Sequence, residues 1–463
     1  MKVAEQMKLF LEPKSVALFG VSRAAEAASL GILGSMLGLG FPGKIYPIHP
    51  HIDGLLGVKV YPTVKDVPVD IDLAIVAIAR ESIPGVVKEC VEKGIKAILI
   101  TTQGFADADA EGKRLQSETV KIAQEVGARV IGPNTIGVNN YFRNFTTSLA
   151  HLEKVGNNPF AFVSQTGTFN HGISPSTIAG KFVDLGNKCD VDFADVLEYL
   201  EDDPETRLIA LHIENVKDGK RFMEVAARVS RKKPVLALKN GKSKRGIRAT
   251  LSHTGSLAGR DEVYDAAFKQ CGIIRVRDVD ELEDLIKTFL YLPVMKGRRV
   301  ALCLQSGALG VMAADACETY NLKLAEVSRE TREKIQSLSP SWQSIENPFD
   351  ILAACLRGNY RDTYRTILKA LLDDDNVDAV LCFSHGVELN KGNVLDITDM
   401  LMELASSHDK PLIPWIYWAP HVQEQTAKLE KTRRIVTYPT IERAIRALAT
   451  QRNYVEWRSS LGG

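Results

Sequence analysis

A histidine within a short polar segment is the residue of this sequence best suited to covalent chemistry. His253 lies in Ser252-His253-Thr254-Gly255-Ser256, where hydroxyl residues and glycines surround it. Small neighbours leave an imidazole accessible, and hydroxyl and N–H donors suit phosphate oxygens. A neutral imidazole nitrogen is a nucleophile near pH 7 if another group fixes its tautomer and supports its charge. Because a single histidine is more often structural, this segment alone leaves both interpretations open.

The acidic residue best placed to support such an imidazole is Glu214. It directly follows the apolar run 208–213, which reads as a buried strand. Between this strand and the histidine the sequence is cationic, with Lys239, Lys242, Lys244, Arg245 and Arg248. These groups favour an anionic ligand near His253.

Three turns after expected strands combine glycine with small polar residues. Ser164-Gln165-Thr166-Gly167 and Gln305-Ser306-Gly307 are nearly identical, and Gly20 is followed by Ser22 and Arg23. A strand-to-helix turn exposes N–H groups that bind phosphate, but Ser and Thr also cap helices when no ligand is present. The full GxGxxG pattern is absent after Gly20, so that turn by itself is a weak signal.

The elements that must position these residues alternate between short apolar runs and helical stretches. Runs without polar alternation, such as 73–78 and 97–100, are typical of strands buried on both faces of a parallel sheet. Expected helices include 83–93, 110–127 and 261–270. Similar strand-and-turn patterns begin near residues 159 and 299, which indicates an internal duplication of one α/β unit. We therefore expect an α/β fold with a Rossmann-like domain (1–145) and two flavodoxin-like doubly wound domains (146–295 and 296–463).

Composition excludes several classes of function. The chain has 463 residues and a net charge of +1 from 58 basic and 57 acidic residues, which predicts binding neither to nucleic acid nor to an anionic membrane. The beginning of the sequence does not read as a signal peptide, and no apolar run is long enough for a membrane span. Seven scattered cysteines without a CxxC pair suggest buried thiols in the cytoplasm, neither disulfides nor a metal site.

Several motifs together resemble the ADP-forming acyl-CoA synthetases (acetate–CoA ligase, ADP-forming) of the succinyl-CoA synthetase superfamily, over nearly the whole chain. The segment 252–259 resembles the phosphohistidine segment of that family. Further similar motifs are Gly132-Pro133-Asn134, Ser164-Gln165-Thr166-Gly167, Gly186-Asn187-Lys188, Asp190-Val191-Asp192, Val216-Lys217-Asp218-Gly219 and Asn347-Pro348-Phe349-Asp350. The combination is far more specific than any one of these motifs.

The resemblance implies an α subunit that converts acyl-CoA, phosphate and ADP reversibly into a carboxylic acid, CoA and ATP. His253 would carry the phosphoryl group and Glu214 would hydrogen-bond the imidazole. The phosphate would contact Ser164, Gln165, Thr166, Gly167, Ser252, Thr254, Gly255 and Ser256. CoA would contact Gly20, Ser22, Arg23, His49, His51 and Asn134. ATP or ADP with Mg²⁺ would bind a separate ATP-grasp β subunit, in an α2β2 assembly, because three α/β units already use the length of this chain.

Some residues depart from the pattern of the family. Arg23-Ala24-Ala25-Glu26 and His49-Pro50-His51 replace the usual Pro-Gly-Lys and Asn-Pro-Lys turns, which puts the CoA phosphate contacts in question. Thr135 replaces a cysteine, and Phe169-Asn170-His171 replaces small residues. The last two changes suggest an unusual or bulky acyl substrate.

Two alternatives remain open at the level of sequence. A CoA- or nucleotide-binding regulatory module without turnover would explain the changed turns, although such a module has no use for the pair His253 and Glu214. A dinucleotide-dependent oxidoreductase rests only on the Rossmann-like opening, which lacks the glycine fingerprint and a clearly placed acidic residue for a ribose.

Overall fold

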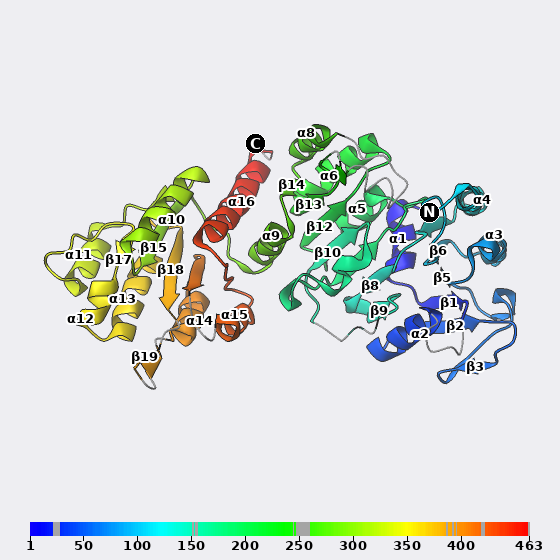
Figure 1. The fold of residues 1–463 in the computed structure, drawn as a ribbon, viewed down its shortest axis with the longest axis horizontal. Helices are drawn as coiled ribbons and strands as arrows, with labels where there is room; N and C mark the ends of the chain where they lie inside the picture. The colour runs from blue at the N-terminus through cyan, green and yellow to red at the C-terminus, as the bar shows by residue number, and fades with distance from the viewer. Residues whose placement is uncertain are drawn as a thin grey trace. The chain divides into compact units, whose positions relative to one another are not determined.

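The computed structural model describes the chain apart from residues 22–27, 151, 153–155, 244, 247–259, 386–387, 391–392, 395, 418–421 and 462–463. The chain divides into two compact units, Met1–Leu282 and Glu283–Gly463, whose elements are labelled in Figure 1. Each unit is built on parallel sheets covered by helices.

The first unit opens with a five-stranded parallel sheet in the order β2-β1-β5-β6-β7. Its strands are β1 (Ser15–Phe19), β2 (Lys44–Ile48), β5 (Leu73–Val76), β6 (Ala97–Ile100) and β7 (Arg129–Ile131). Every residue of β5 and β6 is buried, so both faces of the sheet need a cover of helices.

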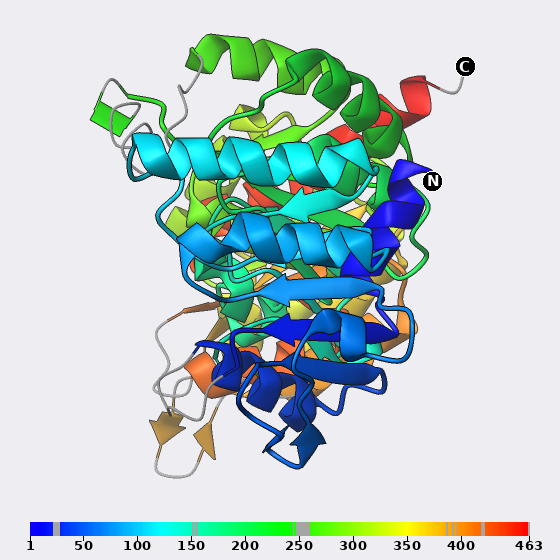
Figure 2. The ribbon, with the colours of Figure 1, turned by 90° about the vertical axis from the view of Figure 1, so that its right-hand side faces the viewer.

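Two pairs of helices provide that cover. Helices α3 (Ile83–Glu92) and α4 (Ala110–Glu125) lie side by side (Figure 2) and pack on one face of the sheet. Helices α1 (Val3–Leu11) and α2 (Ala28–Leu39) pack on the other face. The smaller elements are β3 (Gly54–Leu55), β4 (Val58–Lys59), η1 (Val64–Asp66) and η2 (Arg80–Ser82).

The second sheet of this unit has seven strands in the order β14-β13-β12-β10-β11-β8-β9. Its parallel strands are β10 (Phe160–Ser164), β11 (Lys181–Asp184), β12 (Leu208–Ile213), β13 (Val235–Lys239) and β14 (Ile274–Val276). The antiparallel edge is formed by β8 (Val138–Asn140) and β9 (Phe145–Thr146). Helices α5 (Phe193–Glu201), α6 (Gly219–Lys232) and α8 (Asp261–Cys271) pack on one face. The 3₁₀ turns are η3 (Tyr141–Arg143), η4 (Gly167–His171) and η5 (Pro175–Thr177).

The second unit repeats this plan with a smaller sheet. Its strands follow the order β16-β15-β18-β21, and β17 also pairs with β15. They are β15 (Arg299–Leu304), β16 (Lys323–Leu324), β17 (Phe349–Asp350), β18 (Ala379–His385) and β21 (Leu412–Tyr417), with the hairpin β19 (Glu388–Asn390) and β20 (Asn393–Val394). The helices are α10 (Gly307–Thr319), α11 (Arg329–Leu338), α12 (Leu352–Arg357), α13 (Tyr360–Asp373), α14 (Thr398–Ser407), α15 (Val422–Glu430) and α16 (Ile441–Ser460). Helix α9 (Val279–Tyr291) crosses from the first unit into the second.

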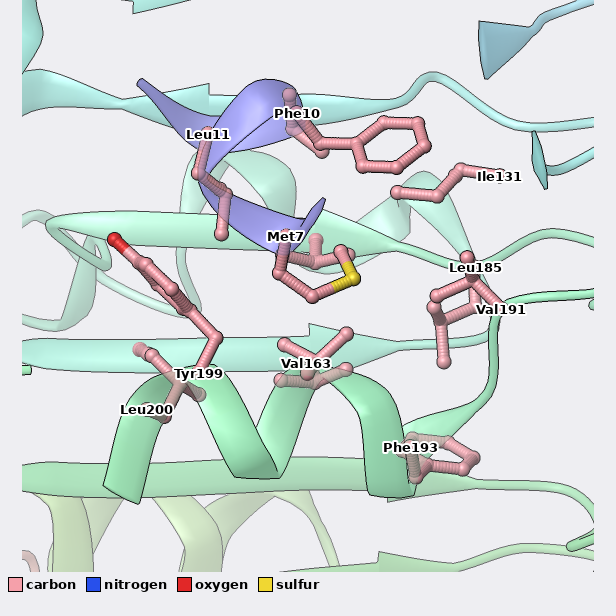
Figure 3. Close-up of a cluster of buried hydrophobic side chains, with 14 of the residues drawn as sticks. Met7, Phe10, Leu11, Ile131, Val163, Leu185, Val191, Phe193, Tyr199 and Leu200 are labelled. Atoms are coloured by element: carbon pink, nitrogen blue, oxygen red, sulfur yellow. The ribbon is translucent and has the colours of Figure 1, made fainter. Parts of the chain in front are cut away.

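One hydrophobic core joins the two sheets of the first unit. Phe10 and Leu11 of α1 cluster with Val163 of β10 and Leu200 of α5, and Ile131 of β7 belongs to the same cluster (Figure 3). Polar contacts follow the same path, because the Asn140 side chain donates to the Leu11 carbonyl and the Tyr199 hydroxyl to Glu12. The N-terminal helix therefore belongs as much to the second sheet as to the first.

The expected fold class is confirmed. The strand order of the second sheet, with its first parallel strand between the second and the third, is that of a flavodoxin-like doubly wound sheet, and the sheet of the second unit repeats it. Helix α8 begins at Asp261 as predicted. A helix long and apolar enough to span a membrane is absent from the described residues.

Candidate functional site

A cavity of about 440 Å³ lies where the two sheets of the first unit present the carboxyl ends of their strands. From the first sheet, residues that follow β5, β6 and β7 line it, and from the second sheet residues that follow β10 and β11. The lining comprises Ala77, Ile78, Thr101, Thr102, Gln103, Asn134, Thr135, Ile136, Leu149, Gln165, Thr166, Gly167, Asp184, Gly186 and Asn187. Ligands of doubly wound sheets bind at this end of the strands.

Two glycines permit the close backbone approach around this cavity. Gly20 ends β1 with a φ of +83°, and a Cβ there would lie 2.2 Å from the Ala77 carbonyl oxygen. Gly186 has a φ of +55°, and a Cβ there would lie 2.4 Å from the Pro133 carbonyl oxygen. Neither position accepts a side chain, so both turns are specified by the sequence.

The turn after β10 is held by its own polar side chains. Thr166 caps η4 by accepting from the Thr168 N–H, and the Ser164 hydroxyl accepts from the Thr166 N–H at 3.0 Å. The Gln165 side chain reaches β12, where its Oε1 accepts from the N–H groups of Glu214 at 2.9 Å and Asn215 at 3.0 Å. Gln165 therefore fixes the backbone at Glu214 relative to the cavity that it lines.

Asp184 ends β11, lines the cavity and bonds to the segment that joins β7 of the first sheet to β8 of the second. Its carboxylate accepts from the Ile136 N–H at 3.0 Å and from the Gly186 N–H at 3.1 Å. Burial raises the pKa of Asp184 to about 6, and the carboxylate of Glu214 acts in the same direction, although the two N–H groups favour the charged form. The group is thus close to its titration range at neutral pH.

Two buried lysines flank Glu214, which is itself 8% exposed. Lys188 donates to Asp192 at 3.0 Å and to the Asn215 carbonyl at 2.7 Å, and burial lowers its pKa. Lys239, at the end of β13, lies 4.6 Å from the centre of the Tyr264 ring, and burial lowers its pKa to about 8. The charge of Glu214 favours the protonated form of both lysines.

The structure brings together part of the predicted site. Asn134, Gln165, Thr166 and Gly167 line the cavity, and Glu214 is bonded to Gln165. Ser164 is buried beneath the same turn. Gly20 lies against Ala77 and Ile78, two lining residues.

Other predicted residues lie elsewhere or are not described. His49 and His51 follow β2, with the His51 N–H donating to Nδ1 of His49 at 3.1 Å, and neither lines the cavity. Ser22, Arg23, Ser252, His253, Thr254, Gly255 and Ser256 lie outside the described residues. Their assignments therefore stay predictions.

The hypothesis of a bulky acyl group drew on Phe169, which is not among the residues that line the cavity. Its ring stacks on Phe162 with centroids 5.0 Å apart and lies 5.3 Å from the ring of His212. Thr135, in contrast, does line the cavity. The expected influence of Thr135 and of Phe169-Asn170-His171 on the acyl substrate stays a prediction.

Sequence reasoning missed Asp184 and Asn215. Asp184 ends β11, so its position after an apolar strand was the available signal. Two of the motifs noted in the sequence also have structural roles, because Asp192 caps α5 and Asp218 caps α6. Among the described residues, a cluster of His, Cys, Asp and Glu that could hold a metal ion is absent.

Paired doubly wound sheets with a polar cavity at their carboxyl ends define an α/β protein that binds nucleotide-like ligands. Residues 14–141 match the family model for a CoA binding domain, and residues 157–289 match that for a succinyl-CoA ligase like flavodoxin domain. The α subunit of acetate–CoA ligase (ADP-forming) II from Pyrococcus furiosus is 37% identical over 98% of both chains. The chain belongs to the family of α subunits of ADP-forming acetate–CoA ligases, which are acid–thiol ligases.

Two further comparisons extend this result. The ADP-forming acetate–CoA ligase II of Archaeoglobus fulgidus is 37% identical over 80% of this chain, but the match spans only 56% of that longer protein. The solved structure of the dinucleotide-forming acetyl-coenzyme A synthetase 1 of Candidatus Korarchaeum cryptofilum, in complex with phosphate and ADP, has a TM-score of 0.87 at 30% identity and is covered over 98% of its chain. The family expected from the sequence motifs is confirmed.

Proposed function

We propose that this chain is the phosphoryl-carrying subunit of an ADP-forming acyl-CoA synthetase, with His253 as the carrier. Phosphate attacks the thioester carbonyl, the CoA thiol leaves with a proton, and an acyl phosphate forms. The imidazole of His253 then attacks phosphorus and the carboxylate leaves. ADP finally accepts the phosphoryl group from His253, which regenerates the free imidazole and yields ATP.

The observation that carries this proposal is the bond between the Gln165 side chain and the backbone of Glu214. It joins the polar turn 164–167, at the mouth of the cavity, to an acidic residue at the end of the neighbouring strand. Glu214 then has the role of holding the tautomer of His253 and stabilising the imidazolium character that develops during transfer. The charge of Glu214 raises the pKa of both Lys188 and Lys239, so two ammonium groups lie close enough to interact with its carboxylate.

The first domain, residues 1–145, is the part of the chain that we assign to binding CoA. Gly20 packs closely against Ala77 and Ile78, which line the cavity, so a ligand in the cavity would lie beside the turn after β1, where helix N–H groups can bind phosphate. CoA supplies the thiol that forms or leaves the thioester. We assign Gly20, Ser22, Arg23, His49, His51 and Asn134 to its binding, and the division into domains 1–145, 146–295 and 296–463 belongs to the same proposal.

The nucleotide end of the reaction is assigned to a second chain. The match to this chain spans 56% of the longer relative from Archaeoglobus fulgidus, which leaves a large remainder for a further activity. We propose an ATP-grasp β subunit that binds ADP or ATP with Mg²⁺, an α2β2 assembly and a cytoplasmic location. The substrate would be a small carboxylic acid.

Labelling of His253 tests the proposal. Incubation with ³²P-labelled inorganic phosphate and acetyl-CoA, butyryl-CoA or benzoyl-CoA should label the chain at a base-stable, acid-labile site. The variant His253→Asn should not label, and Glu214→Gln should label about 10²-fold more slowly, because an orienting and charge-stabilising group is lost. Equal labelling of His253→Asn would refute the carrier role. CoA binding without any labelling, even with a matching ATP-grasp partner and ATP, would favour a regulatory module.

A further inference from the structure

Two buried carboxamides beside Glu214 have polar atoms without partners. Nε2 of Gln165 and both side-chain polar atoms of Asn215 make no hydrogen bond within the described part of the chain. Gln165 is 3% exposed and Asn215 is 4% exposed, so solvent does not satisfy these atoms. Buried donors and acceptors normally have partners, and such exceptions call for an explanation.

The direction of the Gln165 carboxamide is fixed by its surroundings. Its Oε1 accepts from two backbone N–H groups, those of Glu214 and Asn215. An NH₂ group cannot accept a hydrogen bond, so the reverse orientation is excluded. Nε2 is therefore a donor held in place at the wall of the cavity that Gln165 lines.

Asn215 is tied to the same arrangement through its backbone. Its N–H donates to Gln165 at 3.0 Å and its carbonyl accepts from Lys188 at 2.7 Å. The backbone is thus held on both sides, while the side chain makes no hydrogen bond to any residue that the structure describes. Asn215 also directly follows Glu214, the residue assigned to hold His253.

The charged groups near Gln165 and Asn215 indicate how this pair would interact with an anion. The described residues that line the cavity include no lysine, arginine or histidine. The nearest buried ammonium, that of Lys188, is engaged with Asp192 and with the Asn215 carbonyl. The carboxyl of Asp184 also lines the cavity, so the groups that could attract an anion here are neutral N–H donors. Such donors stabilise developing charge on oxygen without the tight retention that a cation produces.

We propose that Gln165 and Asn215 form a neutral amide receptor that binds the oxygens of the phosphoryl group while it passes between acyl phosphate and His253. The inference deepens the proposed function, on which it rests, and adds Asn215 as a binding residue. A neutral receptor suits this reaction, because the phosphoryl group must be released from the receptor at each transfer.

Isosteric variants test this receptor in the full-length chain. Gln165→Glu keeps an oxygen for the two backbone N–H groups but replaces the free donor by an acceptor. Asn215→Asp likewise replaces the amide donor of Asn215 by an acceptor. We expect each variant to slow labelling of His253 by ³²P-phosphate and acyl-CoA about 10²-fold or more, and to abolish binding of inorganic phosphate in calorimetry. Asn215→Leu should also lose labelling but melt at the same or a higher temperature, because it removes unpartnered polar atoms.

The matched control is Gln425→Glu, which alters a buried glutamine of α15 whose Oε1 also lacks a partner in the described residues. Its labelling should equal that of the wild type. If the Asn215 variants label normally, or if Asn215→Leu melts at a markedly lower temperature, the pair is structural and the inference fails while the carrier role stands. If the Asn215 variants lose binding of acetate but still bind phosphate, the pair binds the carboxylic acid and not the phosphoryl group, which would also overturn the inference. Absence of labelling in the wild type would instead refute the proposed function.

Discussion

Asp184 illustrates how a single buried carboxyl couples the two sheets of the first unit. It accepts hydrogen bonds from the N–H groups of Ile136, which follows β7, and of Gly186, which follows β11. Burial nevertheless dominates and raises its pKa to about 6. The residue therefore favours the folded state when protonated and opposes it when ionised, the reverse of a surface carboxylate in an ion pair.

The stability of the protein should reflect this ionisation. The unfolded state titrates Asp near pH 3.9 and the folded state near pH 6. The folded state therefore binds more protons between these values, and the contribution of Asp184 is present below about pH 4 and lost as the pH rises through 6. We expect the free energy of unfolding of the wild type, relative to Asp184→Asn, to fall by roughly 2 kcal/mol across this range. Urea unfolding of both proteins from pH 4.5 to 7.5 measures this, and a difference independent of pH would contradict it.

At the scale of elements, the cavity depends on turns that admit no side chain. Gly186 follows β11 with a positive φ and lies against the carbonyl groups of Pro133 and Asn134. These carbonyls belong to the turn after β7, so the glycine sets the distance between a strand end of each sheet. The same approach brings Asn134 and Asn187 to the cavity, where their side chains bond at 3.5 Å.

Gly186→Ala should separate these strand ends. A Cβ at 2.4 Å from a carbonyl oxygen forces the backbone to shift, and the left-handed conformation adds strain, so we expect a loss of about 2–4 kcal/mol in the free energy of unfolding. Gly85→Ala is the matched control, because a Cβ in α3 meets no atom within 4 Å. That variant should be neutral or up to about 1 kcal/mol more stable. Equal stability of the two variants would show that the turn adapts without cost.

The sequence predicted the elements better than the site. Apolar runs such as 73–76 and 97–100 identified buried parallel strands, because short runs without polar alternation are typical of strands covered on both faces. The turn 164–167 was recognisable from its residue types. Asp184 and Asn215 were not, because their importance depends on β11 and β12 flanking β10, an order that local patterns do not contain. His49 and His51 were assigned to CoA from the resemblance; they do not line this cavity, and their assignment stays a prediction.

At the scale of the whole molecule, the cysteines are shielded from solvent. Cys90, Cys271, Cys303, Cys317, Cys355 and Cys382 are buried, and Cys189 is partly buried. Burial also raises the pKa of Cys189 to about 12, which leaves almost no thiolate near neutral pH. The thiols are therefore part of the packing of both units.

The burial of the cysteines can be tested by thiol labelling. The native protein treated with a thiol-exchange reagent at pH 7.5 should show no rapidly reacting group, because the thiolate is the reactive form and burial suppresses it. After denaturation in guanidinium chloride all seven cysteines should react. Cys189 is the most accessible of the thiols. Any slow reaction of the native protein should therefore be reduced in the control variant Cys189→Ser. A native thiol that reacts as fast as free cysteine would mean that at least one unit opens readily.

The core shared by α1 and the second sheet also constrains how such chains diversify. Met7, Phe10 and Leu11 pack with Val163 and Leu200, residues more than a hundred positions away (Figure 3). A recombination event that exchanged the first sheet alone would have to supply a matching apolar helix, or leave this surface exposed. The two sheets of the first unit should therefore be inherited together as one piece.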